Sequence, residues 1–188
     1  MSGDGGPVSR LYEELRTEIC RIMQLASTKG WSPGSSANTS ARVPGTNHVC
    51  VKSTGTSMAF GALDPESSVV VIGLDGNHVD SVRKPSMEVR FHLGIYKVRP
   101  DVGAVLHAHS PYATAYAVAN QEFPMVSALG RLMLKKVPLL AFAPPGARMN
   151  LRESILGPSN LTNTLKELRS HCKLSIRGTL RWVRKLVS

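Results

Sequence analysis

The sequence predicts a single α/β domain, and three observations support this fold class. At 188 residues the chain can bury one hydrophobic core but is too short for two. The first thirty residues carry apolar side chains at spacings of three and four, as an amphipathic helix does. Further along, the β-branched run SSVVVIG is followed by an Asp-Gly turn and a second short run, which indicates a hairpin. Helices and strands are therefore expected to share one core.

The first half of the chain predicts one helix and then short strands. The helix ends near Gly30, and its apolar positions are Leu11, Leu15, Ile19, Ile22 and Met23. The segment 31–48 is rich in Gly, Pro, Ser and Asn, so we expect turns around a short strand at 40–43. A second strand lies within 47–55 and stops at Gly55. A strand, a tight turn and another strand follow over 67–79.

The second half predicts two more helices and two more strands. A helix begins at Pro85, because proline fits the first helical position, and it closes before Pro100. Its apolar face is Val89, Leu93 and Tyr96. The apolar segment 103–109 then predicts a strand, 110–121 a helix, and 137–146 a further strand and turn.

The composition excludes several classes of protein. Hydrophobic residues make up 42% of the chain and charged residues 19%, a balance typical of globular proteins and not of disordered chains or coiled coils. No apolar run approaches the roughly 20 residues that a membrane-spanning helix needs, and the N-terminus lacks the pattern of a signal peptide. The three cysteines have no CxxC spacing, so we expect reduced, packed thiols. These features predict a cytoplasmic protein with no membrane partner.

The net charge of +10 belongs mainly to the C-terminal tail. Residues 1–147 carry 14 basic and 11 acidic side chains, whereas residues 148–188 carry 9 and 2. A basic tail is usually solvated, so no nucleic-acid partner is expected. The alternative is a nucleic-acid or acidic-surface binder that uses Arg177, Arg181, Trp182, Arg184 and Lys185.

Two histidines and a glutamate are the candidate catalytic residues. His107 and His109 are two positions apart near the end of a predicted strand, so both side chains project from one face and can reach one cation. Neutral imidazole is a good zinc ligand, and a catalytic zinc takes three protein ligands. Glu88 lies at the start of the preceding helix, where a carboxylate can transfer a proton beside a metal. The alternatives are ordinary hydrogen-bonded histidines and an ordinary helix-start glutamate.

Three polar turns offer groups that can bind a phosphate. They are 35–38, 53–55 and 85–86, each at the end of a predicted strand or helix. Hydroxyls, an amide and free backbone N–H groups at such positions can cradle an anion. Ordinary loop chemistry is the alternative. His92 is expected to pack against the sheet.

Taken together, these motifs resemble the class II aldolase/adducin family over about residues 10–150. The segment KPSMEVRFHLGIYKVRPDVGAVLHAHSPYATAYA resembles the family's Pro-Ser-x-Glu helix and His-x-His strand, while SANTSARV and KSTG resemble its polar turn and phosphate loop. The resemblance implies a three-layer α/β/α fold with a mostly antiparallel central sheet. It places this domain at 8–150, followed by a divergent basic segment at 151–188.

The resemblance also implies a site and an activity. His107 and His109 would bind one Zn²⁺ per subunit with His171 as third ligand, and Glu88 would be the catalytic acid/base. The residues implied to bind a substrate phosphate are Asn38, Thr54, Gly55 and Ser86. The implied reaction is retro-aldol cleavage of a phosphorylated ketose through a metal-stabilised enediolate, in a homo-oligomer, by resemblance a tetramer.

Several alternatives stay open. The same family includes sugar-phosphate 4-epimerases, dehydratases and decarboxylases, and adducin-like relatives that act as non-catalytic oligomeric scaffolds. Charge and periodicity change abruptly after Arg152, which a reading-frame shift followed by an early stop would produce. That hypothesis predicts a truncated C-terminal part.

Overall fold

The computed structural model describes residues 7–57, 63–81 and 83–133, together with Val137 and Leu139. These residues belong to two compact units, one up to Ser110 and the other from Pro111 onward. The expected domain boundary after residue 150 and most of the strand expected at 137–146 lie outside the described residues. Both stay predictions.

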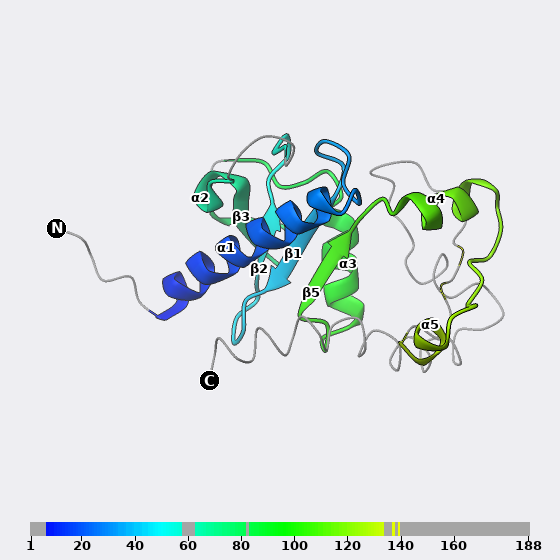
Figure 1. Cartoon of the computed structure of the whole chain (residues 1–188). Coiled ribbons are helices and arrows are strands. Elements are labelled where there is room, and N and C mark those ends of the chain that lie inside the picture. The colour runs from blue at the N-terminus through cyan, green and yellow to red at the C-terminus, as the bar shows by residue number, and fades with distance from the viewer. Residues whose placement is uncertain (1–6, 58–62, 82, 134–136, 138, 140–188) are drawn as a thin grey trace. The chain divides into compact units, whose positions relative to one another are not determined.

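The first unit contains a five-stranded sheet in which every pairing is antiparallel (Figure 1). The strand order is β4-β3-β2-β1-β5. The strands are β1 Asn38–Arg42, β2 His48–Lys52, β3 Val69–Gly73, β4 His78–Asp80 and β5 Ala104–His107. Strand β5 comes last in the sequence yet pairs with β1, which brings two distant parts of the chain together.

The sheet is covered by helices on both faces, which confirms the three-layer architecture (Figure 1). Helix α1, Pro7–Thr28, lies on one face, and helix α3, Val89–Val98, lies on the other. A single short turn of helix, α2 Pro65–Ser68, precedes β3. Asp64 caps α2, because its side chain accepts a hydrogen bond from the Ser67 backbone N–H.

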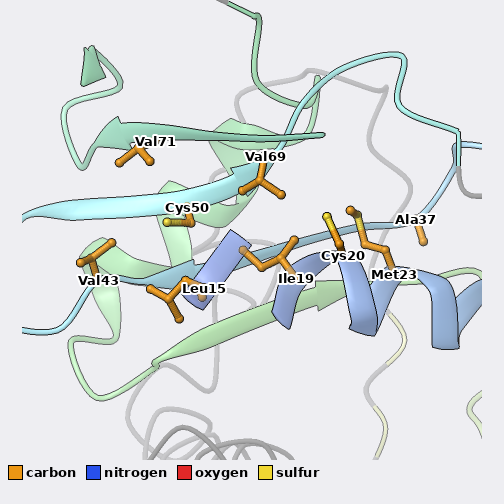
Figure 2. Close-up of a cluster of buried hydrophobic side chains, with 10 residues drawn as sticks. Leu15, Ile19, Cys20, Met23, Ala37, Val43, Cys50, Val69 and Val71 are labelled. Carbon is orange, nitrogen blue, oxygen red and sulfur yellow. The ribbon is translucent and has the colours of Figure 1, made fainter. Parts of the chain in front are cut away.

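Strand register determines which side chains meet which helix. Ala41 is paired with Cys50 and Cys50 with Val71, so these three share one face of the sheet. They belong to the hydrophobic cluster that contains the buried face of α1, drawn in Figure 2. The intervening residues of β1 point to the opposite face. Ser40 is one of these, and its side chain contacts α3.

The buried face of α1 follows the predicted periodicity. Its buried residues include Leu15, Ile19, Cys20 and Met23, and Met23 is completely buried. Burial of each of the Leu, Ile and Met side chains stabilises the fold by roughly 1.5–3 kcal/mol. Cys20 and Cys50 are free, and burial raises their pKa values to about 11 and about 12, so both remain thiols. For these two cysteines the expectation of packed, reduced thiols is confirmed.

The hairpin expected over 67–79 is formed by β3 and β4. Gly76 lies in its turn with a φ of +94°, a conformation that glycine adopts without strain. The helix expected from Pro85 begins instead at Val89, because Pro85 forms an isolated β-bridge with Ser53. The Ser86 N–H also donates to the Lys52 carbonyl, at 2.8 Å, which holds this segment extended beside β2.

The second unit contains α4, Pro111–Val118, and α5, Ala128–Met133. Helix α4 confirms the helix expected over 110–121, whereas α5 was not expected. Before α5, the Ser127 hydroxyl accepts a hydrogen bond from the Gly130 N–H at 2.9 Å. None of the helices among the described residues has the length and hydrophobicity of a membrane-spanning segment.

Candidate active site

The candidate residues of the first unit gather at one end of the sheet. Asn38, the first residue of β1, is paired with His107, the last residue of β5. Strand β2 runs antiparallel to β1, so its C-terminal end lies at the same end of the sheet as Asn38, and Ser53, which follows β2, is bridged to Pro85. The 53–55 and 85–86 turns therefore lie at the end of the sheet that holds Asn38 and His107.

His107 and His109 converge on one point. Their Nε2 atoms are 3.1 Å apart, and the two rings are nearly perpendicular with centroids 4.9 Å apart. Strand β5 ends at His107, so His109 lies just beyond it. The His109 N–H donates to the Trp31 carbonyl at 2.7 Å, which ties this residue to the loop after α1.

The spacing of these two nitrogens fits a shared zinc ion. Zinc–nitrogen bonds of about 2.0–2.1 Å at a tetrahedral angle place two ligand nitrogens about 3.3 Å apart. Metal binding also requires neutral imidazole. Burial and the neighbouring His109 lower the pKa of His107, although Glu88 raises it, and the net lowering favours the neutral ring. The same 3.1 Å separation is also that of a hydrogen bond between the two rings, so ordinary hydrogen-bonded histidines stay the alternative.

A complete metal site is not present among the described residues. No group of three His, Cys, Asp or Glu side chains with ligand geometry is found in that part of the chain. His171, the third ligand that the family resemblance implies, lies outside the described residues. Its role stays a prediction.

Glu88 immediately precedes α3 and is half-buried. Glu88 occupies the N-cap position of α3, but its side chain makes no capping hydrogen bond, and an ordinary helix-start glutamate favoured by the helix dipole stays the alternative. Its charge acts on His107, whose pKa it raises, so the carboxylate lies within electrostatic range of the histidine pair. The backbone N–H of Glu88 donates to the Ser86 hydroxyl at 3.2 Å, which joins it to the 85–86 turn.

Backbone hydrogen bonds hold the 53–55 turn and the 85–86 turn together. The Thr54 N–H donates to the Lys84 carbonyl at 2.9 Å, and the Ser86 N–H donates to Lys52. These two backbone N–H groups already donate to carbonyls of the protein and are not available to a phosphate. Since the Ser86 hydroxyl accepts from Glu88, its own proton remains for a ligand. Gly55 is exposed with a φ of +72°, so a side chain there would strain the turn.

Asn38 is buried and contacts a polar network beneath the sheet. His92 Nε2 lies at short hydrogen-bond distance from Asn38 Oδ1, and His92 Nδ1 is 2.6 Å from Ser40 Oγ. Ser40 Oγ is in turn 2.8 Å from the Tyr96 hydroxyl. Burial lowers the pKa of His92 to about 4, so this ring is neutral at pH 7.

Sequence reasoning placed His92 against the sheet but did not find this network. The available signal was a pair of matching spacings. Asn38 and Ser40 are two residues apart on a strand, and His92 and Tyr96 are four apart on a helix, so each pair shares one face. Only the packing of α3 on β1 shows that the two faces meet.

Comparison with known proteins identifies what this arrangement is similar to. The chain matches the family described as "Class II Aldolase and Adducin N-terminal domain" over residues 17–173. The match contains both histidines, Glu88 and the three polar turns.

Two curated relatives carry different names. The methylthioribulose-1-phosphate dehydratase of Pseudomonas savastanoi is 38% identical over 102 residues, which are 54% of this chain and 48% of that protein. The 5-deoxy-D-ribulose 1-phosphate aldolase of Bacillus thuringiensis is 33% identical over 138 residues, which are 73% of this chain and 59% of that protein. The chain thus spans about half the length of these relatives.

A solved structure of an L-fuculose 1-phosphate aldolase has the same fold. It superimposes with a TM-score of 0.67 and covers 88% of this chain and 86% of its own. Its sequence identity is 19%, so the likeness concerns the fold.

Proposed function

Because the chain belongs to the class II aldolase and adducin N-terminal domain family, we propose that it is a zinc-dependent lyase that cleaves a carbon–carbon bond of a phosphorylated ketose. The observation that carries this proposal is the convergence of two imidazole nitrogens, 3.1 Å apart, within electrostatic range of a carboxylate that caps nothing. Family membership makes a lyase the expected class of enzyme. The metal, the substrate and the bond that breaks are the proposed parts.

His107 and His109 hold the metal in this proposal, and His171 is the proposed third ligand. A zinc ion bound there supplies Lewis-acid stabilisation of negative charge on substrate oxygens. The backbone contacts of both residues support this assignment, since His107 is paired with β1 and the His109 N–H donates to the Trp31 carbonyl. Little rearrangement is then needed when metal binds.

Glu88 transfers the proton. Its carboxylate removes a proton from the substrate hydroxyl or carbon and returns one to the product, as a general base and then a general acid. The position of Glu88 supports this role. Its backbone N–H donates to the Ser86 hydroxyl, and its charge raises the pKa of His107. A substrate bound between the phosphate turns and the histidines would place its reacting carbons beside this carboxylate.

Asn38, Thr54, Gly55 and Ser86 bind the substrate phosphate in this proposal. Two loops and a strand end supply neutral donors, a pattern suited to an anion. The pairing of Asn38 with His107 supports a phosphate site that adjoins the proposed metal ligands. A small sugar phosphate can therefore contact both.

A dehydratase is the second candidate, favoured by the name of the 38%-identical relative. The same metal and carboxylate could promote loss of water, 4-epimerisation or decarboxylation, because each begins by building negative charge beside a carbonyl. A non-catalytic scaffold is a further alternative. Assembly into a tetramer, a cytoplasmic location and a divergent segment after residue 150 complete the proposal.

An assay of three ketose 1-phosphates tests the proposed reaction. L-fuculose 1-phosphate, 5-deoxyribulose 1-phosphate and methylthioribulose 1-phosphate are each incubated with zinc-loaded protein, and products are identified by mass spectrometry. We expect two shorter carbon chains, one of them a three-carbon phosphate, and loss of the reaction when a chelator removes zinc. A product that has lost one water molecule and kept its whole carbon chain would instead establish a dehydratase. No conversion of any substrate by zinc-loaded protein would contradict both.

A further inference from the structure

We propose that His92 is a positioning residue for anion binding, which holds the Asn38 side-chain amide so that its Nδ2 group faces the bound phosphate. The proposal rests on the proposed function only in assigning Asn38 to the phosphate. It adds a residue on the far side of Asn38 that touches neither substrate nor metal.

The contact between the two side chains is buried and specific. His92 has no exposed surface, and Asn38 is 3% exposed. The His92 ring lies between β1 and α3 with both nitrogens hydrogen-bonded, Nε2 to Asn38 Oδ1 and Nδ1 to Ser40 Oγ. A ring held at both nitrogens cannot rotate without breaking two buried hydrogen bonds, each costly to leave unsatisfied.

The orientation of the Asn38 amide gives one consistent direction for each hydrogen bond. Asn38 Oδ1 can only accept, so the neutral His92 ring carries its proton on Nε2 and donates it to that oxygen. His92 Nδ1 then accepts from the Ser40 hydroxyl, and Ser40 Oγ accepts from the Tyr96 hydroxyl.

The hydrogen bond from His92 determines which polar group of the Asn38 amide is left for a ligand. With Oδ1 held by His92, the Nδ2 group is left, and it has no protein acceptor among the described residues. The flipped amide would instead present its oxygen, an acceptor that repels phosphate. An asparagine alone populates both orientations, so His92 removes the unfavourable one before the anion binds.

Two substitutions at position 92 separate this role from simple packing. In His92→Gln the side-chain amide reaches the position of Nε2 and can still donate to Asn38 Oδ1. In His92→Asn the shorter amide reaches only the position of Nδ1, so the contact with Ser40 is kept and the one with Asn38 is lost. Both remove the ring, which makes them matched controls for lost packing.

The experiment measures the affinity for inorganic phosphate by isothermal titration calorimetry, at constant ionic strength. The proteins are wild type, His92→Gln, His92→Asn, Asn38→Ala and the double variant His92→Asn/Asn38→Ala, each first checked for a cooperative thermal transition. We expect His92→Asn to weaken phosphate binding about tenfold and His92→Gln to stay within about threefold of wild type. In the Asn38→Ala background, His92→Asn should change the affinity by less than about twofold, because its effect passes through Asn38.

The outcomes separate this inference from the proposed function. Equal losses in His92→Gln and His92→Asn, or a further tenfold loss in the double variant, would overturn the positioning role and leave His92 as a packing residue. If His92→Asn does not fold, the comparison of His92→Gln with Asn38→Ala decides: phosphate binding as weak in the former as in the latter overturns the role. An Asn38→Ala variant that binds phosphate as tightly as wild type would overturn the phosphate assignment itself, whatever happens at position 92.

Discussion

Replacing Glu88 with glutamine should leave metal binding intact and lower kcat by about a thousandfold. Glutamine has nearly the same shape, so the start of α3 and the Glu88 N–H to Ser86 hydrogen bond are kept. It cannot accept or return a proton, and the side chain makes no capping hydrogen bond whose loss would destabilise the helix. The measurement is steady-state turnover of the best sugar phosphate, with zinc content determined on the same samples.

Glu66→Gln is the matched control, since Glu66 is an exposed residue of α2. It should keep full turnover. A Glu88→Gln enzyme with wild-type kcat would refute the role of this carboxylate, whereas loss of zinc in that variant would make Glu88 a ligand rather than the proton-transfer group.

Replacing His107 with alanine should remove both metal and activity. One of two converging imidazoles is deleted, and a single remaining histidine on an exposed segment binds zinc weakly. We expect at least about a tenfold fall in zinc per chain after dialysis, since three protein ligands are the usual catalytic set. Elemental analysis before and after dialysis measures this, together with turnover.

His78→Ala is the control for this variant. His78 is an exposed histidine of β4, at the opposite edge of the sheet from β5, so its loss should change neither zinc content nor activity. Zinc retained at the wild-type level by His107→Ala would place the metal elsewhere. Activity retained without bound zinc would show that the reaction does not require the metal.

The elements that the sequence predicted well depend on neighbouring residues. Helix α1 follows from apolar spacing, and the β3–β4 hairpin follows from a β-branched run and a turn with Gly76. The start of α3 was wrong by four residues because a long-range bridge, Ser53 to Pro85, outweighs the local preference of proline for a first helical position. The start of this helix depends on a contact between distant segments, and local patterns in a single sequence do not predict such contacts.

The candidate site shows the same division. The His-x-His spacing predicted two imidazoles on one face, and their Nε2 atoms do converge. The polar network around His92 was missed, because it requires α3 to pack on β1 across more than fifty residues of sequence. The network can be predicted only when the strand face with Asn38 and Ser40 is known to contact the helix face with His92 and Tyr96.

Zinc-edge X-ray absorption spectroscopy of the dialysed wild-type protein tests the central claim most directly. It reports both whether zinc is bound and which atoms surround it. The account predicts about one zinc per chain, with the multiple-scattering pattern of at least two imidazoles at about 2.0–2.1 Å. A protein without zinc, or a zinc shell without imidazole, would contradict the assignment of His107 and His109 and with it the proposed chemistry.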